Sequence, residues 1–263
     1  DRFCKRSVKN TSKVAGLKLA LSMIDLTTLE GKDTPGKVRQ LCYKALHLHE
    51  QLDNIPTVAA VCVYPTYVKI AKNELKDSGI QVASVATAFP SGQSSFATKI
   101  MDTQFAVEQG ADEIDMVICL GAARAADFAG VLEEIRRVVA ASEGAVVKVM
   151  VECCLFDDEV KQRLTEIVAL SGADYVKTST GCAASGATIE DVGLLSQVAS
   201  SRVKVKAAGG IRDWATCQAM LAAGANRIGT SAGVVILQQW RESGKDPPEN
   251  AVDTTHAAMA HAQ

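Results

Sequence analysis

The chain has 263 residues, of which 48% are hydrophobic and 22% are charged, and its formal net charge is -2 at pH 7. This length can build one large hydrophobic core, and α/β barrels of this size are commonly single domains. The nearly balanced charge excludes a broad basic surface for nucleic acid, and no apolar run approaches the ~20 residues that cross a membrane. We therefore expect one globular domain with no nucleic acid and no membrane among its partners.

The eight cysteines are spread through apolar segments, with no Cys-x-x-Cys spacing and no histidine cluster beside them. This pattern predicts no zinc site and favours a reducing, cytoplasmic location. Residues 1–15 are basic and lack the apolar segment of a secretory signal, which agrees with that location.

Short β-rich runs alternate with longer stretches of helical period along most of the chain, which predicts βα units around a parallel sheet. We predict strands at residues 19–24, 58–63, 82–86, 113–118, 146–151, 175–176, 203–205 and 227–228. We predict helices at residues 37–48, 66–76, 95–108, 128–141, 158–170, 189–198, 213–222 and 232–241. Gly110, Gly172 and Gly224 follow helices at C′ spacing, and each precedes Ala and then Asp or Asn, which indicates equivalent joints.

Eight such units predict a fold of class α/β, a single-domain (β/α)8 TIM barrel at residues 17–243, with an N-terminal extension (1–16) and a C-terminal tail (244–263). A doubly wound open sheet is the competing architecture, but no Gly-x-Gly-x-x-Gly follows the first strand. In a barrel, reactive groups gather at the carboxyl ends of the strands. Polar side chains at or near those positions are Asp25, Cys62, Asp115, Lys148, Glu152, Lys177 and Lys206.

Two lysines, Lys177 and Lys206, stand at the ends of predicted strands and run into small polar or glycine residues. A buried ammonium is poorly solvated, and a second ammonium nearby disfavours its charged form further, so one of the pair can become a neutral nucleophile toward carbonyls. The alternative for each lysine is a strand end whose amine reaches water. The glycine-rich continuations, which let a ligand approach the backbone, favour the first interpretation.

Six segments resemble, in order, the motifs of the deoxyribose-phosphate aldolase family. They are SMIDLTTL (22–29), AVCVYP (60–65), GADEIDMV (110–117), DYVKTSTG (174–181), KAAGGIR (206–212) and RIGTSAG (227–233). The resemblance covers about residues 17–239. It implies a class I aldolase on a TIM barrel, with no metal or organic cofactor, that reversibly cleaves 2-deoxy-D-ribose 5-phosphate to acetaldehyde and D-glyceraldehyde 3-phosphate through a lysine Schiff base.

The same resemblance assigns roles to three residues. Lys177 would condense with the substrate carbonyl, Lys206 would lower the pKa of Lys177 and relay protons, and Asp115 would act as the acid/base group. The alternative for Asp115 is a structural carboxylate that pairs with a buried lysine, and the two roles are compatible.

A phosphate site is expected at the loops after the seventh and eighth strands, where backbone N–H groups bind anions. Its expected residues are Thr180, Gly181, Gly209, Gly210, Gly229 and Ser231, with Arg212 as a source of charge. Asp25, Thr27, Cys62 and Lys148 would line the pocket or hold its polar network, although a cysteine in an apolar strand is most often a small core residue.

The chain also departs from the family pattern. Cys182 stands where some members have a phosphate-contacting lysine, and the tail has no terminal tyrosine. Two alternatives therefore stay open: an attenuated or inactive homologue that binds a protein partner, and a Schiff-base aldolase for another phosphorylated aldehyde. A homodimer is possible by analogy with relatives. Lys204 shares strand parity with Lys206, so it would point into the barrel and need a carboxylate partner unless a bulge turns it outward.

Overall fold

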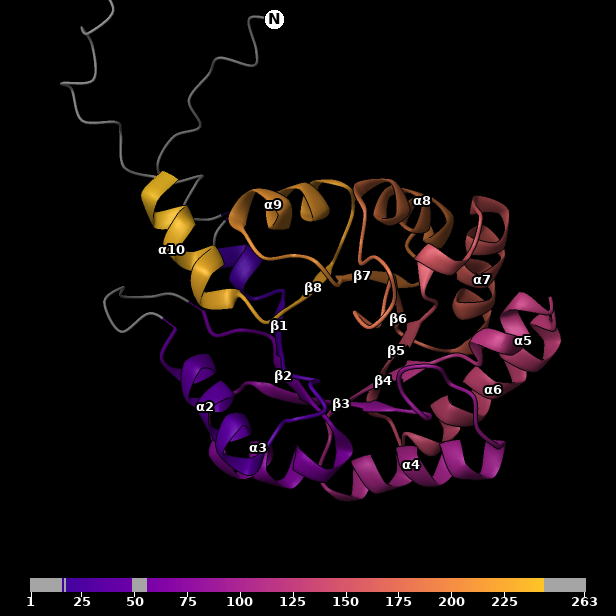
Figure 1. Ribbon diagram of the computed structural model, residues 1–263, viewed down its shortest axis with the longest axis horizontal. Helices are drawn as coiled ribbons and strands as arrows, with labels where there is room; N and C mark the ends of the chain where they lie inside the picture. The colour runs from indigo at the N-terminus through magenta and orange to yellow at the C-terminus, as the bar shows by residue number, and fades with distance from the viewer. Residues whose placement is uncertain (1–15, 17, 49–55, 244–263) are drawn as a thin grey trace, which may run out of the picture.

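Eight parallel strands close into a barrel in sequence order, as predicted (Figure 1). The structure is a computed structural model that describes residues 16, 18–48 and 56–243. The predicted extension (1–16, apart from Gly16) and tail (244–263) lie outside these residues. The strands are β1 Ile24–Thr27, β2 Ala60–Val63, β3 Gln81–Ala86, β4 Glu113–Val117, β5 Val146–Met150, β6 Tyr175–Lys177, β7 Lys204–Ala208 and β8 Arg227–Thr230. Pairing of β1 with β8 completes the closure.

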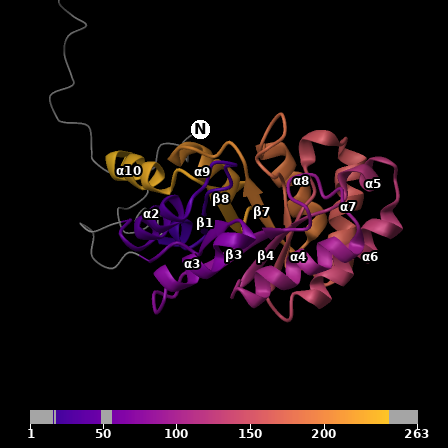
Figure 2. The ribbon, with the colours of Figure 1, turned by 60° about the horizontal axis from the view of Figure 1, so that its bottom comes forward.

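Helices surround the barrel on its outside (Figures 1 and 2). They are α2 Pro35–Leu46, α3 Val68–Glu74, α4 Phe96–Glu108, α6 Phe128–Ala141, α7 Asp158–Ser171, α8 Ile189–Ala199, α9 Trp214–Ala222 and α10 Gly233–Ser243. Three further short helices, η1 Pro65–Tyr67, α5 Leu120–Arg124 and η2 Cys153–Leu155, lie in connections. Along the described chain, no helix combines the length and the apolar character that a bilayer crossing requires.

The first predicted strand was wrong. Residues 18–21 are helical, and β1 begins only at Ile24. Leu19 is exposed whereas Ala20 and Leu21 are buried, a one-sided burial that suits a helical turn. A short apolar run does not distinguish a strand from a helix by periodicity alone, so the six apolar or small residues were assigned to the wrong element. The correction places Asp25 inside β1 rather than after it.

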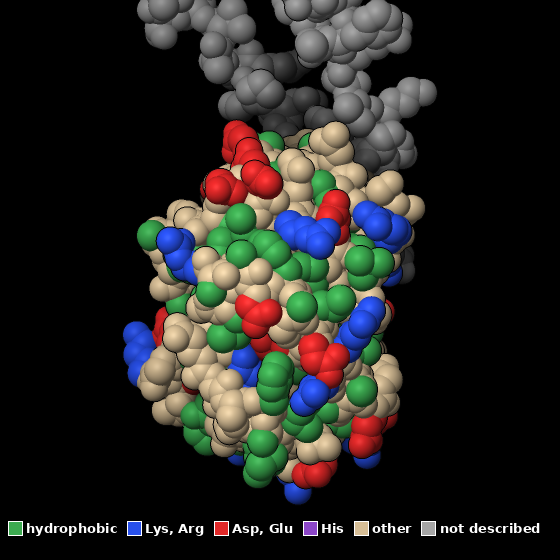
Figure 3. Space-filling model, turned by 90° about the vertical axis from the view of Figure 1, so that its right-hand side faces the viewer, with side chains coloured by type: hydrophobic (Ala, Val, Ile, Leu, Met, Phe, Trp, Pro, Cys, Tyr) green, Lys and Arg blue, Asp and Glu red, His purple; other side chains and the backbone are tan. Residues whose placement is uncertain are grey.

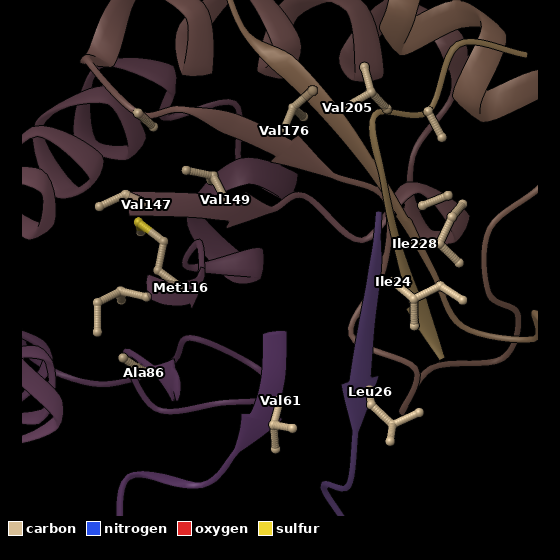
Figure 4. Close-up of a cluster of buried hydrophobic side chains, with 14 of the residues drawn as sticks. Ile24, Leu26, Val61, Ala86, Met116, Val147, Val149, Val176, Val205 and Ile228 are labelled. Atoms are coloured by element: carbon tan, nitrogen blue, oxygen red, sulfur yellow. The ribbon is translucent and has the colours of Figure 1, made fainter. Parts of the chain in front are cut away.

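Side chains on the strands alternate between two different environments. The outward-facing side chains, including Leu26, Val61, Met116 and Val149, belong to the hydrophobic layer between the barrel and the helices (Figure 4). The inward-facing side chains form a separate apolar cluster, with Ala60, Cys62, Ala83, Val85, Val117 and Met150. Many of the other inward positions carry charged groups, such as Asp115 on β4 and Lys206 on β7, because the pleat turns every second residue into the barrel.

Three joints of the barrel repeat the same hydrogen bonds, which confirms the equivalence predicted from Gly-Ala-Asp/Asn. Gly110, Gly172 and Gly224 have φ values of 101°, 92° and 113°. The Asp112, Asp174 and Asn226 side chains accept hydrogen bonds from the backbone N–H groups of Val82, Val147 and Val205 at 2.8, 2.9 and 2.9 Å. Each side chain therefore ties the start of one strand to the start of its neighbour.

The outer surface also mixes both charge signs. On the face formed around α5, α6 and α7, acidic, basic and apolar side chains are interspersed (Figure 3).

Replacing Asp174 with Ala should lower the free energy of unfolding by about 1–2 kcal/mol, because the buried N–H of Val147 loses its acceptor. Urea denaturation followed by circular dichroism measures this difference. Glu108→Ala, an exposed change at the end of α4, is the control and should stay within about 0.5 kcal/mol of the parent. Equal effects of the two changes would contradict a structural role for the joint.

Candidate active site

The interior of the barrel holds a network of four cationic and three acidic side chains from six strands. The cations are Lys148, Lys177, Lys206 and Arg227, and the acids are Asp25, Glu113 and Asp115. The exposed fraction of each side chain is 4% or less, except for Arg227 at 12%. The strand register explains the gathering, since Asp115 pairs with Lys148 and Lys177 pairs with Lys206 on neighbouring strands.

Asp115 lies at the centre of this network. Its Oδ2 accepts hydrogen bonds from Lys177 Nζ and Lys206 Nζ, each at 2.7 Å, and its Oδ1 accepts one from Lys148 Nζ at 2.8 Å. The two lysines singled out in the sequence thus share one carboxylate oxygen. The structure places them together in one buried network.

Asp25 and Glu113 form the next layer, toward the amino ends of the strands. Asp25 accepts from Lys206 Nζ at 2.5 Å and from Arg227 Nη1 at 2.6 Å. Glu113 accepts from Arg227 Nη2 at 2.8 Å and also from Lys148 Nζ. Lys148 therefore reaches three carboxylates, because its Nζ is also 3.4 Å from Asp25.

The charges of the network do not balance when every lysine is protonated. Four cations then face three carboxylates, and an uncompensated buried charge is costly. Among the residues that the structure describes, Lys177 has one carboxylate partner, whereas Lys206 has two. A neutral Lys177 leaves three cations opposite three anions, so Lys177 is the amine that most readily gives up its proton.

The pKa values follow the same order. Burial lowers the pKa of Lys177 below its ordinary value, and Lys206 adds to this shift while Asp115 opposes it. Burial also acts to lower the pKa of Lys206, but Asp115 and Asp25 outweigh it and raise that pKa. The predicted influence of Lys206 on Lys177 is therefore present, and burial is the larger cause.

A cavity of about 310 Å³ opens at the carboxyl ends of the strands, which we call the C-terminal mouth, and it reaches Lys177. Sequence-predicted residues that line it are Thr27, Thr180, Gly181, Gly209, Gly210, Gly229 and Ser231, together with Arg212. Asp25, Asp115, Lys148 and Lys206 lie below this lining, in the charged network. The predicted pocket residues are thus divided between a cavity wall and a buried support.

Cys62 belongs to neither group. It is fully buried on β2 and packs in the inward-facing apolar cluster. Burial raises the pKa of its thiol to about 11, with Asp115 adding to the shift. The thiol is therefore protonated at neutral pH, and the interpretation as a small core residue fits its surroundings.

Glu152 shapes the loop after β6. Its backbone is left-handed, with φ 53° and ψ 66°, and its carboxylate is buried. Its Oε2 accepts hydrogen bonds from the backbone N–H of Thr180, at 3.1 Å, and from the Thr180 hydroxyl. Thr180 Oγ1 in turn accepts from Cys182 N at 3.1 Å. A strained residue that fixes a cavity loop in this way is typical of functional sites.

The loops after β6 and β7 touch backbone to backbone. Gly209 has φ +87°, and a Cβ there would lie 2.9 Å from Gly186 Cα. A Cβ on Gly186 would lie 2.2 Å from Gly209 O. Side chains at these positions would force the loops apart, so both glycines are needed to keep this part of the cavity wall closed.

The Lys204 side chain does not point into the charged interior as predicted. It shares the inward parity of Lys206, but as the first residue of β7 it lies at the opposite rim of the barrel and is exposed. Its Nζ lies 5.5 Å from the centroid of the Tyr175 ring. Over the part of the chain that the structure describes, it forms no ion pair with a carboxylate, because the side chain reaches solvent instead.

Several site residues were missed by the sequence reasoning. Glu113 and Arg227 complete the charged network, while Lys37 and Lys44 of α2 line the cavity. The parity of Glu113 with Asp115, two residues apart on one strand, was an available signal. Lys37 and Lys44 gave none, since charges on a helix usually face solvent. No group of His, Cys, Asp and Glu side chains suited to a metal ion occurs among the described residues.

Comparisons with known proteins find similar sequences over most of the chain. The model of the DeoC/LacD family aldolases matches residues 19–240. Curated deoxyribose-phosphate aldolases are 47% identical over 227 residues in Syntrophotalea carbinolica (86% of this chain, 99% of that protein) and 42% identical over 234 residues in Thermotoga maritima (89% and 91%).

Solved structures agree with these matches. An aldolase called QR15 has a TM-score of 0.78 at 34% identity and covers 85% of this chain and 96% of its own. The deoxyribose phosphate aldolase from Aeropyrum pernix, described as a unique tetramer, has a TM-score of 0.79 at 30% identity, with coverage of 89% and 96%.

Replacing Asp115 with Asn should lower the free energy of unfolding by about 3–5 kcal/mol, because three buried lysines lose their shared counter-charge. Chemical denaturation at pH 7 measures the change. Glu133→Gln removes a carboxylate from an exposed ion pair with Arg137 and serves as the control, with an expected loss below about 1 kcal/mol. A loss of this small size for Asp115→Asn would show that the network is only weakly coupled.

Proposed function

The chain belongs to the DeoC/LacD aldolase family, and from this premise we propose that it reversibly cleaves 2-deoxy-D-ribose 5-phosphate to acetaldehyde and D-glyceraldehyde 3-phosphate through an imine on Lys177. One observation carries the proposal. A buried lysine with a lowered pKa, Lys177, lines the cavity at the C-terminal mouth, and it shares one oxygen of Asp115 with a second lysine, Lys206.

The chemistry begins with attack of the neutral Lys177 amine on the C1 aldehyde of the substrate, which forms a carbinolamine. Loss of water gives a protonated imine, an electron sink. When the C3 hydroxyl loses its proton, the C2–C3 bond breaks, its electron pair moves to the imine as an enamine, and D-glyceraldehyde 3-phosphate departs. Protonation of the enamine at C2 and addition of water then release acetaldehyde and restore the amine.

Asp115 carries the proton transfers in this proposal, and Lys206 supports it. Asp115 accepts a hydrogen bond from the nucleophile itself, at 2.7 Å, so it can take and return a proton through a bound water as the carbinolamine collapses. Lys206 stays charged because Asp25 and Asp115 both contact it. Its ammonium therefore keeps the Asp115 carboxylate ionised next to the reacting amine.

The substrate phosphate would bind at the rim of the cavity, against Gly181, Gly209, Gly210, Gly229 and Ser231. Backbone N–H groups at such loops bind phosphate in many barrels. Cys182, which replaces a family lysine, also lines this cavity, but so do Lys37, Lys44 and Arg212. The cavity thus retains positive charge without a lysine at position 182.

This retained charge favours a phosphate-binding enzyme over an inactive protein-binding homologue, but it suits an aldolase for another phosphorylated aldehyde equally well. Borohydride trapping of Lys177 separates these possibilities. Labelling in the presence of deoxyribose 5-phosphate supports the proposal, and labelling only by another carbonyl compound supports the aldolase for another aldehyde. No labelling supports the inactive homologue.

The homodimer and the cytoplasmic location remain predictions. The tetramer described for the Aeropyrum pernix relative shows that assembly differs from the predicted dimer in at least one family member. Phe96, Met101 and Phe105 on α4 are partly exposed apolar groups that an interface could cover.

Borohydride reduction in the presence of deoxyribose 5-phosphate should attach an acetaldehyde-derived group to Lys177, which peptide mass spectrometry detects. Lys177→Leu should abolish both labelling and turnover, while Lys204→Leu, at the opposite rim of the barrel, should retain both. Undiminished turnover in Lys177→Leu would refute the assigned nucleophile, provided that both variants keep the parent circular dichroism spectrum.

Replacing Ser231 with Ala should raise the KM for deoxyribose 5-phosphate by about 10- to 150-fold, because a hydrogen bond to a charged group contributes about 1.5–3 kcal/mol. The KM for unphosphorylated 2-deoxy-D-ribose should not change. Steady-state assays of both sugars measure the split, with the exposed change Ser94→Ala as control. Equal effects on both sugars would place the phosphate elsewhere.

A further inference from the structure

Arg227 enters the charged network from the far end of the barrel. It is the first residue of β8 and lines a cavity of about 390 Å³ at the amino ends of the strands, which we call the N-terminal mouth. Tyr175 and Lys204, the first residues of β6 and β7, line the same cavity. In a parallel barrel, the two mouths lie on opposite sides, so Arg227 cannot touch a substrate bound over Lys177.

The guanidinium of Arg227 is held firmly in place. Its Nη1 donates to Asp25 Oδ1 at 2.6 Å, its Nη2 donates to Glu113 Oε1 at 2.8 Å, and its Cζ lies 5.6 Å from the Tyr175 ring centroid. Two carboxylates and an aromatic face thus hold one rigid, permanently charged group. Lysine at this position would keep the charge but not the planar fork.

Arg227 also determines how much carboxylate charge is available to compensate the three lysines. Asp25 and Glu113, which Arg227 contacts, are the carboxylates that also hold Lys206 and Lys148. With Arg227 present, three carboxylates must compensate one arginine and three lysines, so one lysine is in excess. Without it, three carboxylates match three charged lysines, and nothing in the charge balance favours a neutral Lys177.

We propose that Arg227 is a positioning residue that keeps the Lys177 amine unprotonated from the opposite mouth of the barrel, an inference that rests on the proposed imine chemistry. Because an arginine does not lose its proton in proteins, the excess charge always falls on a lysine. Lys177, with the fewest carboxylate partners of the three, is the lysine that responds.

The groups that face these two residues support this coupling. Around Arg227 they are Asp25 on β1, Glu113 on β4, Lys148 on β5, Tyr175 on β6, and Lys204 and Lys206 on β7. Around Lys177 they are Cys62 on β2, Asp115 on β4, Cys182 in the loop after β6 and Lys206 on β7. Burial raises the pKa of both thiols, so within the described part of the chain Asp115 is the one anion in contact with Lys177. Arg227 acts on Lys177 through the layer formed by Asp25, Lys206 and Lys148.

The test follows the reductive labelling of Lys177 by acetaldehyde and cyanoborohydride as a function of pH. Only the free amine attacks the carbonyl, so labelling rises as the pH rises through the pKa of Lys177. Arg227→Met should move the midpoint upward by about one pH unit and slow labelling at pH 7 about tenfold. Arg227→Lys, which keeps the charge, should leave the midpoint near that of the parent.

A compensating variant distinguishes charge from simple structural support. Glu113→Gln alone removes one anion, so the midpoint should fall. In Arg227→Met combined with Glu113→Gln, three lysines face two carboxylates, one lysine is again in excess, and the midpoint should return toward the parent value. A purely structural role for Arg227 predicts the opposite, since losing both partners of the contact would not restore the parent behaviour.

Arg202→Met is the matched control, because Arg202 lines the same cavity but forms no ion pair within the described part of the chain. Its midpoint should equal that of the parent. An unchanged midpoint in Arg227→Met, or a double variant that behaves like Arg227→Met, would overturn the inference. If Arg227→Met does not fold, a raised midpoint in Glu113→Gln would overturn it instead. Failure of the parent protein to label would refute the proposed function itself.

Discussion

The hydrogen bonds that three buried lysines make to Asp115 are the interaction on which the interior of this barrel depends. Burying several ammonium groups is affordable only if carboxylates contact them directly, and one carboxylate serves Lys148, Lys177 and Lys206 at 2.7–2.8 Å. The arrangement is stable because Asp25 and Glu113 share the remaining charge. The sharing is unequal, and Lys177 receives the smallest part.

The strands deliver these groups through alternation and register alone. Glu113 and Asp115 face inward because they are two residues apart on β4, while Ile114 and Met116 between and beyond them join the outer hydrophobic layer. A shift of one residue would place the carboxylates among the helices and the isoleucine in the network. The hydrophobic layer shown in Figure 4 therefore fixes the position of the charges as firmly as the ion pairs do.

The sequence predicted much of this arrangement, for reasons that can be named. Strand alternation and glycine punctuation gave the barrel and its joints, and the motifs gave Lys177, Lys206 and Asp115. The ion pairs inside the barrel could not be predicted from local patterns. Arg227 contacts Asp25, which is 202 residues away in the sequence, and Glu113, which is 114 residues away. The first strand was misplaced because its apolar run suits either kind of element. Lys37 and Lys44 reach the cavity through the way α2 packs, which no local pattern reports.

The two mouths of the barrel contain different parts of the charged network. The C-terminal mouth exposes one amine and a wall of glycine-rich loops to a ligand, while the N-terminal mouth holds the arginine that the excess charge depends on. In the proposed chemistry, this separation would let a permanent cation bias the protonation of Lys177 without lying in the path of a substrate. Lys206 already lies beside Lys177 as a neighbouring cation on the same Asp115 oxygen. Arg227 adds its charge to the network from the amino ends of the strands, where it takes no room from the C-terminal mouth.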